Sequence, residues 1–435
     1  MTPWKPNRRV ANFCARIGQA GANACNRVSP TRSLMSEPVT DTRRGVPEHD
    51  QDGRLAVLSR VELKHCRRWS YAFASERKDH RYYEIVEDTI QREFEFRYFA
   101  IMDDDGEVRA VQPFFILDQD LLAGTSRKVR PIIEAVRRAW PGFMRVRTLM
   151  IGCAAGEGHL DGDDGPSQSS HAKILASTVA EHARKLGASI IVLKEFPARY
   201  RTALSCFEQY GFTRVPSLPM TKLNIDYPNF DEYMKRALNS ATRTKLRRKF
   251  RIAAQARPID MTVVDDVTPL IGEIYPLYLQ VYERSALHFE KLTEEYFCRI
   301  GRQMSDKARF FIWRQNGKII AFALCLVEGD TFFAEYVGFD YAVALNLHLY
   351  HYVVRDMISW AIDNNYKSFR SSGLNYDPKL HLRHLLDPVD LYVRHTSWMI
   401  NGVLKRALPL IEPTRYDKTL RKFSNYGELW GQTSP

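Results

Sequence analysis

The order of the expected elements most constrains the fold of this 435-residue chain, because one order occurs twice. In the first half, strand-like runs at Phe94–Met102 and Glu107–Leu117 flank the turn Asp103–Gly106, a pattern typical of a β-hairpin. A helical pattern at His171–Leu186 and an apolar strand at Ser189–Leu193 complete this first set.

The second half repeats that order. Strand-like runs at Ala308–Arg314 and Lys318–Val327 are joined by an Asn-Gly turn, which is a strong hairpin signal. A third run, Thr331–Phe339, precedes a helical pattern at Leu345–Ile362 and a strand at Tyr366–Ser371. The repeated order predicts two structurally related units.

Antiparallel strands followed by a helix and a further strand are typical of a sheet of mixed direction. We therefore predict an α/β (α+β) fold with mixed, mainly antiparallel sheets flanked by helices. The predicted division is a first domain at 51–225 and a second at 226–435; two unrelated α/β domains are the alternative. Residues 1–50 lack periodicity and are predicted to be a disordered basic tail, either a targeting segment or an over-extended start before Met35.

The composition excludes several classes of protein. The longest apolar stretch, Trp398–Ile411, is interrupted by Lys405 and Arg406 and is too short to span a membrane, so no transmembrane segment is predicted. The seven cysteines are scattered without a CxxC motif, which argues against structural zinc and a disulfide framework. We predict a cytoplasmic protein without a metal; the sequence leaves the oligomeric state open.

The net charge of +12 is concentrated in one segment. Residues 234–257 carry nine Lys or Arg side chains and no acid, and are predicted to form one basic helix. Arg243, Arg247, Arg248 and Arg251 are the candidate anion-binding residues, because like charges four residues apart repel one another unless a partner neutralises them. The partner would carry phosphates, as RNA, a coenzyme or an anionic lipid surface does. Alternatively, acidic groups folded nearby neutralise a solvated helix face.

A carboxylate on the third strand of the second half is the candidate catalytic base. Strict alternation would place Glu335 among apolar side chains and Tyr336 on the opposite face, where Tyr336 is a candidate substrate contact. Burial of Glu335 would then raise its pKa toward the range of a general base. The alternative is a carboxylate paired with a basic side chain. The predicted face of Glu335 also holds Thr331, Phe333, Val337 and Phe339.

The turn that follows the last strand of the second half is dense in hydrogen-bonding groups. Loops at strand ends commonly carry ligand contacts. Tyr376 is the candidate proton donor, and structural turn chemistry is the alternative. The candidate substrate-binding residues are Arg370, Ser372, Asn375 and Lys379.

Two further patterns are weak. The Gly-rich segment Ile151–Gly165 matches neither a P-loop nor a dinucleotide-binding motif and is predicted to be a surface loop at the substrate rim. His348 and His351 lie one helical turn apart without a third ligand, so ordinary helix histidines are expected there.

Several segments together resemble the Fem-like branch of the GNAT acyltransferase superfamily, which is built from two GNAT-type halves. The resemblance covers residues 230–405 and implies transfer of an acyl or aminoacyl group to an amine, from an acyl-CoA or a charged tRNA. The segments that carry it are Thr242–Arg251, Phe310–Val327, Phe332–Phe339, the helix from Leu345, and Ser372–Lys379.

One departure from the family pattern concerns the donor. Members that bind acyl-CoA present a Gly-rich turn before a helix, where backbone N–H groups hold the pyrophosphate. Tyr341–Asn346 stands at that place here and contains no glycine. In the first half, Ser169 and Ser170 are the candidate cofactor-binding residues, because they would cap a helix and leave N–H groups free.

The resemblance therefore predicts a tandem GNAT-like N-acyltransferase that uses acyl-CoA and acts on a small-molecule or peptide amine in its second half. Glu335 would accept the amine proton, Tyr376 would protonate the leaving group and Lys379 would anchor substrate charge. One alternative is a Fem-type aminoacyltransferase with tRNA as partner. The other is a non-catalytic GNAT-like module that binds nucleic acid or an anionic partner through residues 235–251.

Overall fold

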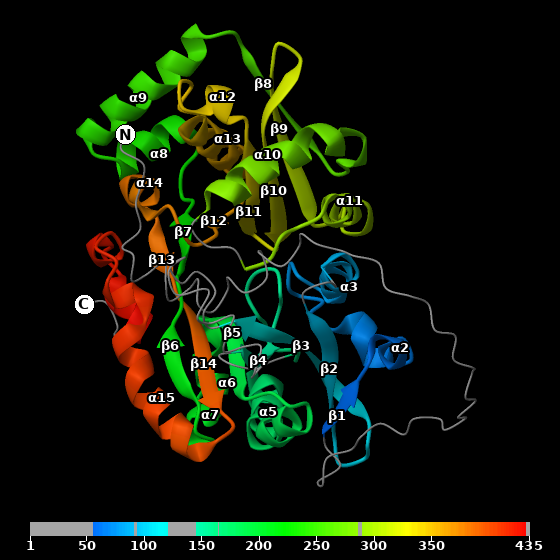
Figure 1. The fold of residues 1–435 in the computed structure, drawn as a ribbon. Coiled ribbons are helices and arrows are strands. Elements are labelled where there is room, and N and C mark those ends of the chain that lie inside the picture. The colour runs from blue at the N-terminus through cyan, green and yellow to red at the C-terminus, as the bar shows by residue number, and fades with distance from the viewer. Residues whose placement is uncertain (1–54, 91–93, 121–144, 164, 286–288, 432–435) are drawn as a thin grey trace, which may run out of the picture.

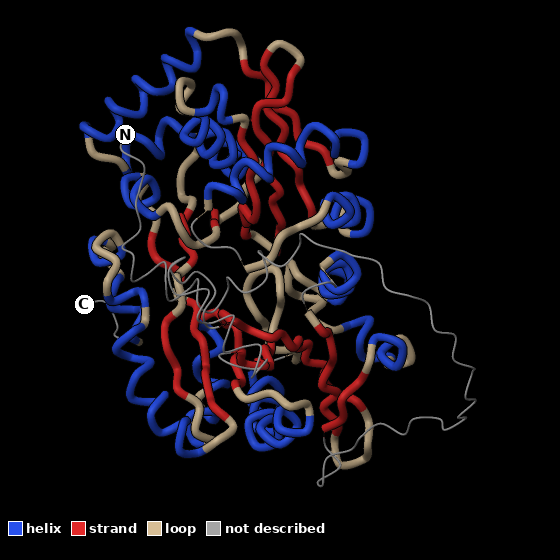
Figure 2. The backbone as a smooth tube through the Cα atoms, in the orientation of Figure 1, coloured by secondary structure: helices blue, strands red, loops and turns tan. Residues whose placement is uncertain are grey.

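The computed structural model describes residues 55–90, 94–120, 145–163, 165–285 and 289–431, which form two seven-stranded sheets (Figures 1 and 2). The first sheet has the order β1 (Leu55–Leu58), β2 (Glu95–Met102), β3 (Val108–Asp120), β4 (Arg145–Ile151), β5 (Ile190–Pro197), β14 (Val389–His395) and β6 (Thr213–Pro216). The second has the order β8 (Ile259–Val264), β9 (Ala308–Gln315), β10 (Lys318–Glu328), β11 (Thr331–Phe339), β12 (Ser368–Ser371), β7 (Met220–Asn224) and β13 (Leu385–Asp387).

The two sheets follow one plan and exchange one strand each. In both, every neighbouring pair is antiparallel except one: β4 with β5 in the first sheet and β11 with β12 in the second. Strand β14, from the end of the chain, inserts between β5 and β6. Strand β7, from the first half, inserts between β12 and β13. The repeated plan and the predicted fold class are confirmed.

Helices lie around both sheets (Figures 1 and 2). Those of the first half are α2 (Arg60–Leu63), α3 (His80–Thr89), α5 (Gly165–Lys185), α6 (Arg201–Leu204) and α7 (Cys206–Gln209), with 3-10 turns at Arg67–Tyr71 and Ala198–Tyr200. Those that follow are α8 (Phe230–Ala237), α9 (Ser240–Gln255), α10 (Ile271–Arg284), α11 (Glu294–Gln303), α12 (Tyr341–Ala344), α13 (Leu349–Asp363), α14 (Tyr376–His381) and α15 (Trp398–Ile411). Further 3-10 turns lie at Thr268–Leu270, Pro413–Arg415, Leu420–Lys422 and Tyr426–Trp430.

The predicted domain boundary at 225/226 separates the two repeats along the chain. The strand exchange crosses it, because β7 lies before the boundary and belongs to the second sheet, whereas β14 lies after it and belongs to the first. The division into two domains at this boundary therefore stays a prediction. Each sheet contains strands from both sides of the boundary. The predicted tail, residues 1–50, lies outside the described residues.

The predicted basic helix at 234–257 is two helices. Helix α8 ends at Ala237, and Asn239 begins α9 by accepting a hydrogen bond from the backbone N–H of Thr242 at 2.8 Å. An asparagine that caps in this way starts a new helix and breaks an existing one. On α9, Leu246 and Ala253 are buried, and the helix packs on α13.

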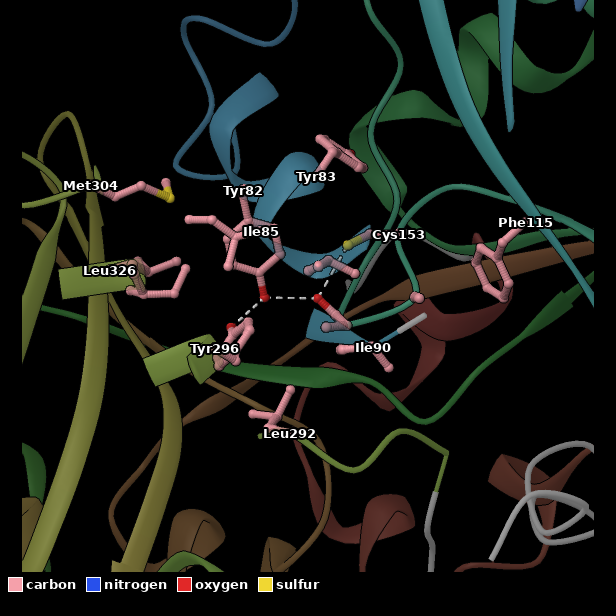
Figure 3. Close-up of a cluster of buried hydrophobic side chains, with 14 of the residues drawn as sticks. Tyr82, Tyr83, Ile85, Ile90, Phe115, Cys153, Leu292, Tyr296, Met304 and Leu326 are labelled. Carbon is pink, nitrogen blue, oxygen red and sulfur yellow. Dashed lines mark hydrogen bonds between the residues drawn. The ribbon is translucent and has the colours of Figure 1, made fainter. Parts of the chain in front are cut away.

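The largest hydrophobic cluster joins the two halves. Tyr82 of α3 and Tyr296 of α11 meet there, and their hydroxyl oxygens lie 2.8 Å apart (Figure 3). The Tyr82 hydroxyl also donates to the backbone carbonyl of Ala155 at 3.0 Å, and Cys153 lies beside it. Satisfied polar groups in a shared apolar core indicate that the halves pack as one body.

Two predictions from the composition concern membrane-spanning segments and disulfide bonds. Among the described residues, no helix combines the length and the apolar character needed to cross a membrane. The five cysteines in the described ranges are free. The cytoplasmic location stays a prediction.

Candidate functional site

Strand β11 carries a β-bulge at Glu335. Along the pairing with β10, Cys325 stands opposite Ala334 and the preceding Leu324 stands opposite Tyr336, so Glu335 is the extra residue. A bulge redirects the side chains on either side of it. Phe333 and Glu335 therefore both meet Arg77 of the first half, and Tyr336 packs against the cluster that joins the halves.

The predicted alternation along β11 is wrong for this reason. Val337 and Phe339, expected beside Glu335, pack instead in the cluster under α13. Tyr336, expected on the opposite face, belongs to the cluster that joins the halves. The sequence pattern assumed a regular strand, and one extra residue reverses the face of every residue beyond it.

The parallel pairing of β11 with β12 stops just before the bulge. Its last partners are Ala334 and Ser371, whereas β11 continues to Phe339. In the described part of the chain no strand pairs with this side of β11 beyond Ala334. The end of the β11–β12 pairing is called the open end here. Beyond it, the backbone groups of residues 335–339 have no strand partner among the described residues on the side of β11 that faces β12.

A cluster of buried charges lies beside the open end. Arg77 donates from Nε to Glu335 Oε1 at 2.6 Å and forms an ion pair with Glu157. Lys78 Nζ lies 2.8 Å from Glu157 Oε2 and 3.3 Å from Glu335 Oε2. These four residues are called the junction cluster here, because two basic residues of the first half hold one carboxylate from each half.

The junction cluster corrects the predicted acid–base chemistry of Glu335. Burial acts to raise the pKa of Glu335, but the positive charges of Lys78 and Arg77 outweigh it and lower the pKa to about 2. The expected raised pKa is wrong, and the alternative of a carboxylate paired with basic side chains describes the observed contacts.

The Gly-rich segment is buried, so its prediction as a surface loop is wrong. Residues 157–161 are buried, and the Gly158 N–H donates to the carbonyls of Lys194 and Glu195 at 3.2 and 3.3 Å. A Cβ on Gly158 would lie 2.7 Å from the Phe196 ring. The pairing of β4 with β5 stops at Leu193, so this segment occupies the corresponding end in the first sheet. Glycine permits that close approach.

A second carboxylate lies near the open end. The Tyr336 hydroxyl donates to Glu290 Oε1 at 3.0 Å, and the Tyr336 ring meets the Tyr296 ring edge-on. Burial raises the pKa of Glu290, although Lys194 acts to lower it. Burial also raises the pKa of Tyr336, so its hydroxyl remains a hydrogen-bond donor. Glu290 thus has the raised pKa that was expected of Glu335.

The predicted substrate residues of the loop after β12 have separate partners. Arg370 pairs with Asp387 and lies over the Phe333 ring, 5.0 Å from its centre, whereas Ser372 and Asn375 are exposed. The loop begins beside the open end, because Ser371 is the last partner of Ala334. Burial together with Arg77 lowers the pKa of Arg370 to about 10.

The Tyr376 and Lys379 side chains each donate a hydrogen bond to a backbone carbonyl. The Tyr376 hydroxyl donates to the Pro219 carbonyl at 2.8 Å, and its ring packs against Phe423. Lys379 donates to the Ser372 carbonyl, and burial lowers its pKa to about 7. Their catalytic and anchoring roles stay predictions.

The candidate anion-binding residues lie on α9 next to the start of α13. Arg247, Arg248 and Arg251 are exposed, whereas Arg243 donates to the Leu238 carbonyl at 2.6 Å and braces the corner before α9. No side chain caps the first turn of α13 in the described structure.

Lys249 links α9 to α13, because its Nζ lies 2.8 Å from Nε2 of His351. Burial and the charge of Lys249 lower the pKa of His351 to about 4, so this histidine is neutral at pH 7. No group of three or more candidate metal ligands occurs in the part of the chain that the structure describes, including the surroundings of His348 and His351.

Ser169 and Ser170 do not cap a helix. Helix α5 begins at Gly165, six residues earlier than the predicted start, so both serines lie inside it. The Ser169 hydroxyl donates to the Gly165 carbonyl at 2.8 Å. The capping prediction is wrong, because Gly165 and Pro166 provide an earlier helix start. Their role toward a cofactor stays untested.

The sequence reasoning missed Arg77, Lys78, Glu157 and Glu290. The Arg77-Lys78 pair lies in a turn between a 3-10 helix and α3, where no periodicity marks it. The glycines around Glu157 were the available signal, because several glycines close together indicate close backbone packing. Glu290 lies in the connection between α10 and α11 and gave no signal.

Two related mixed sheets, each mainly antiparallel with one parallel pair and flanked by helices, form the fold class predicted from the sequence. The chain belongs to the FemAB-like family, described as peptidoglycan biosynthesis/recognition, whose model matches residues 156–381, just over half of the chain. The Fem-like assignment made from the sequence is confirmed.

The curated proteins that match this chain share less than a quarter of the aligned residues with it. A protein of Mycobacterium tuberculosis (strain H37Rv), provisionally named 8-amino-7-oxononanoate synthase 2, is 23% identical over 359 residues, which cover 74% of this chain and 44% of that protein. The same values hold for its counterpart in strain CDC 1551. The chain thus spans less than half the length of these relatives.

Solved structures with a similar fold share little sequence with this chain. FemX is 11% identical, covers 81% of this chain and 99% of its own, and gives a TM-score of 0.47. L-PGS from Bacillus licheniformis is 10% identical, with coverages of 75% and 94% and a TM-score of 0.44. A tandem GNAT protein from the clavulanic acid pathway is 10% identical, with coverages of 72% and 86% and a TM-score of 0.39.

Proposed function

We propose that this protein is an N-acyltransferase that moves an acyl group from acyl-CoA to an amine at the open end of the second sheet. The observation that carries the proposal is the end of the β11–β12 pairing at Ala334 and Ser371, directly before the bulge at Glu335. Unpaired backbone N–H groups beside buried charges are suited to stabilise the oxyanion of an acyl transfer.

The reaction is a direct attack. The acyl carbonyl lies along residues 335–339, and the amine nitrogen attacks the carbonyl carbon as the carbon–sulfur bond breaks. The amine loses one proton, which a nearby carboxylate accepts and returns to the leaving sulfur. The products are an amide and free coenzyme A.

Glu290 is the proton acceptor in this proposal. A general base works best when its pKa lies near the working pH. Burial raises the pKa of Glu290 toward that range, whereas Glu335, with a pKa of about 2, is a weak base. Glu335 instead holds Arg77 and Lys78 in place, and Tyr336 orients Glu290.

Tyr376 and Lys379, in the segment after β12, have secondary roles in the proposed reaction. Tyr376 as the donor to the leaving group and Lys379 as the anchor of substrate charge would both have to leave their backbone acceptors, the carbonyls of Pro219 and Ser372. Ser372 and Asn375 are exposed at the rim and are proposed to contact the acceptor amine.

The donor phosphates are proposed to bind where α9 meets the start of α13. Arg248 and Lys249 lie next to uncapped backbone N–H groups at this helix end. A helix N-terminus with adjacent cations attracts phosphate. The corresponding helix of the first half is α5, which contains Ser169 and Ser170. These two serines are the second candidate for binding the donor phosphates.

An aminoacyl-tRNA donor is the second candidate function. The exposed row Arg247, Arg248 and Arg251 favours it, because a polynucleotide contacts several cations at once. Membership of the FemAB-like family supports it as well. A non-catalytic module that binds an anionic partner is the remaining alternative.

The test compares the donors directly. Purified protein is incubated with acyl-CoAs of several chain lengths and an acceptor panel, and thiol release and N-acyl products are followed by mass spectrometry. The panel includes peptide amines, suggested by the family description, and 8-amino-7-oxononanoate, named in the curated relatives. Thiol release that depends on both substrates supports the proposal.

A parallel experiment measures binding and transfer from charged tRNA at low salt. Transfer from tRNA without any from acyl-CoA would replace the donor in the proposal. Anion binding without transfer from either donor would favour the non-catalytic module.

A further inference from the structure

Helix α15 presents an apolar face to solvent. Met399, Val403 and Leu410 recur at spacings of four and seven residues and therefore share one stripe of the helix. Their exposed fractions are 63%, 69% and 65%, and Trp398 at the start of the helix is 83% exposed. Residues 398–411, the longest apolar stretch of the sequence, thus form a surface helix. No other described residue buries the apolar side chains of its outer stripe.

The opposite face of α15 fixes the helix to the body of the protein. Leu408 is buried and Leu404 packs against the cluster that joins the halves. The Asn401 side chain accepts a hydrogen bond from the His395 N–H and donates to the Gly211 carbonyl, both at 2.8 Å. The helix lies along β14 and β6 at the outer edge of the first sheet (Figure 1). Its outward stripe therefore lies on the surface of the part of the chain that the structure describes.

Positive charge accompanies this stripe. Lys405 and Arg406 are exposed on α15, and the helix contains no acidic residue. The segment that follows, 412–422, adds Arg415, Lys418, Arg421 and Lys422 against Asp417 and Glu412, of which Glu412 is buried. Long cationic side chains next to an apolar stripe can reach lipid phosphates while the stripe enters the acyl boundary.

We propose that α15 seats the protein on the surface of an anionic lipid bilayer, lying in the interface without crossing it. The displayed stripe supplies apolar area, Trp398 suits the headgroup region, and the cations complement anionic headgroups. A second protein copy would bury the stripe equally well but would bring Lys405 and Arg406 close to their own counterparts. This inference does not rest on the proposed transfer reaction.

Vesicle flotation of the full chain tests the proposal. We expect binding to vesicles of phosphatidylglycerol and phosphatidylcholine, little binding to phosphatidylcholine alone, and weaker binding as salt rises. Val403→Asp should raise the lipid concentration for half-maximal binding by about tenfold or more. Val61→Asp is the matched control, because Val61 is 68% exposed on α2, and it should bind as the parent does.

Two further measurements keep the test decisive. The double variant Lys405→Gln, Arg406→Gln changes only exposed polar positions, and about a fivefold loss per cation is expected. Failure of the parent protein to bind anionic vesicles, or equal binding by the Val403→Asp variant, overturns the proposal. Sedimentation that shows Val403→Asp converting a dimer to a monomer, without vesicle binding by the parent, assigns the stripe to a second copy and also overturns it.

Discussion

The two sheets share a strand order but differ where their parallel pairs end. In the first sheet, the Gly-rich segment packs against β5 beyond Leu193, and Gly158 donates to the strand's carbonyls. In the second, β11 runs past Ala334 without a strand partner on that side in the described structure, and carries a bulge. One plan thus yields a filled end in the first sheet and an open end in the second.

The junction cluster is the physical link between these two ends. Arg77, from the first half, is 1% exposed and bonds Glu157 of its own half and Glu335 of the other. A buried ion pair is weak evidence for net stabilisation, but removing one member leaves an unpaired buried charge. The predictions below test whether the halves depend on each other in this way.

The largest effect is expected from Arg77→Met. The change leaves Glu335 with only Lys78 and should lower the free energy of unfolding by about 3–5 kcal/mol, measured by urea denaturation. Arg109→Met is the control, because Arg109 pairs with Asp103 at the exposed surface of a hairpin and its loss should leave the stability nearly unchanged. Equal losses in the two variants would show that the cluster does not hold the halves together.

Local signals in the sequence were sufficient to predict the order of strands and helices that the two halves share. The Asn316-Gly317 turn fixes a hairpin through neighbouring residues alone, and both residues adopt a positive φ as such turns require. The exchange of β7 and β14 depends on pairing between strands roughly 145 to 205 residues apart in sequence, which no local pattern encodes.

The candidate site was only partly predictable for a similar reason. Glu335 was identified by its strand, but its neighbours Arg77 and Lys78 come from the other half of the chain. Their charges decide the direction of its pKa shift, so a local pattern predicted the opposite direction. The bulge depends on how β11 pairs with β10 and is equally invisible in the sequence of β11 alone.

The next effect concerns which carboxylate accepts the proton at the open end. Glu290→Gln should lower kcat/KM by about 10²-fold, because the amide cannot accept a proton. In the parent enzyme, kcat/KM should fall as the pH drops through the raised pKa of Glu290, and the variant should lose this acidic limb.

Glu195→Gln is the matched control from the first half, since Glu195 also lies beside Lys194, at 2.9 Å. It should retain both rate and pH profile. Glu335→Gln should retain the acidic limb, because its pKa of about 2 lies below the assay range. Loss of the limb in that variant, with retention in Glu290→Gln, would return the role of base to Glu335.

Two buried histidines provide a smaller test of the difference between the halves. His159 in the first half lies 3.1 Å from Arg199 and 3.2 Å from Glu76, whereas neither ring nitrogen of His384 has a hydrogen-bond partner among the described residues. Burial and Lys379 lower the pKa of His384 to about 3, so the folded protein excludes a proton that the unfolded chain binds below about pH 6.5.

Stability from His384 is therefore complete above about pH 6.5 and is lost as the pH falls toward 3. At pH 5 the loss should be about 2 kcal/mol relative to pH 7.5, and His384→Phe should remove it, as measured by urea denaturation at both values. The exposed His65→Phe variant serves as the control and should keep the parental dependence. An unchanged dependence in His384→Phe would contradict a buried neutral imidazole.

The smallest expected effect asks which half holds the donor. Lys249→Met removes the cation beside the uncapped start of α13 and should raise the KM for acyl-CoA about fivefold, with kcat little changed. Ser170→Ala, at the corresponding helix of the first half, should leave the KM unchanged, because Ser170 lies within α5 and caps no N–H group. The opposite result would place the donor phosphates at the filled end, and catalysis at the open end would then require the acyl chain to cross between the halves.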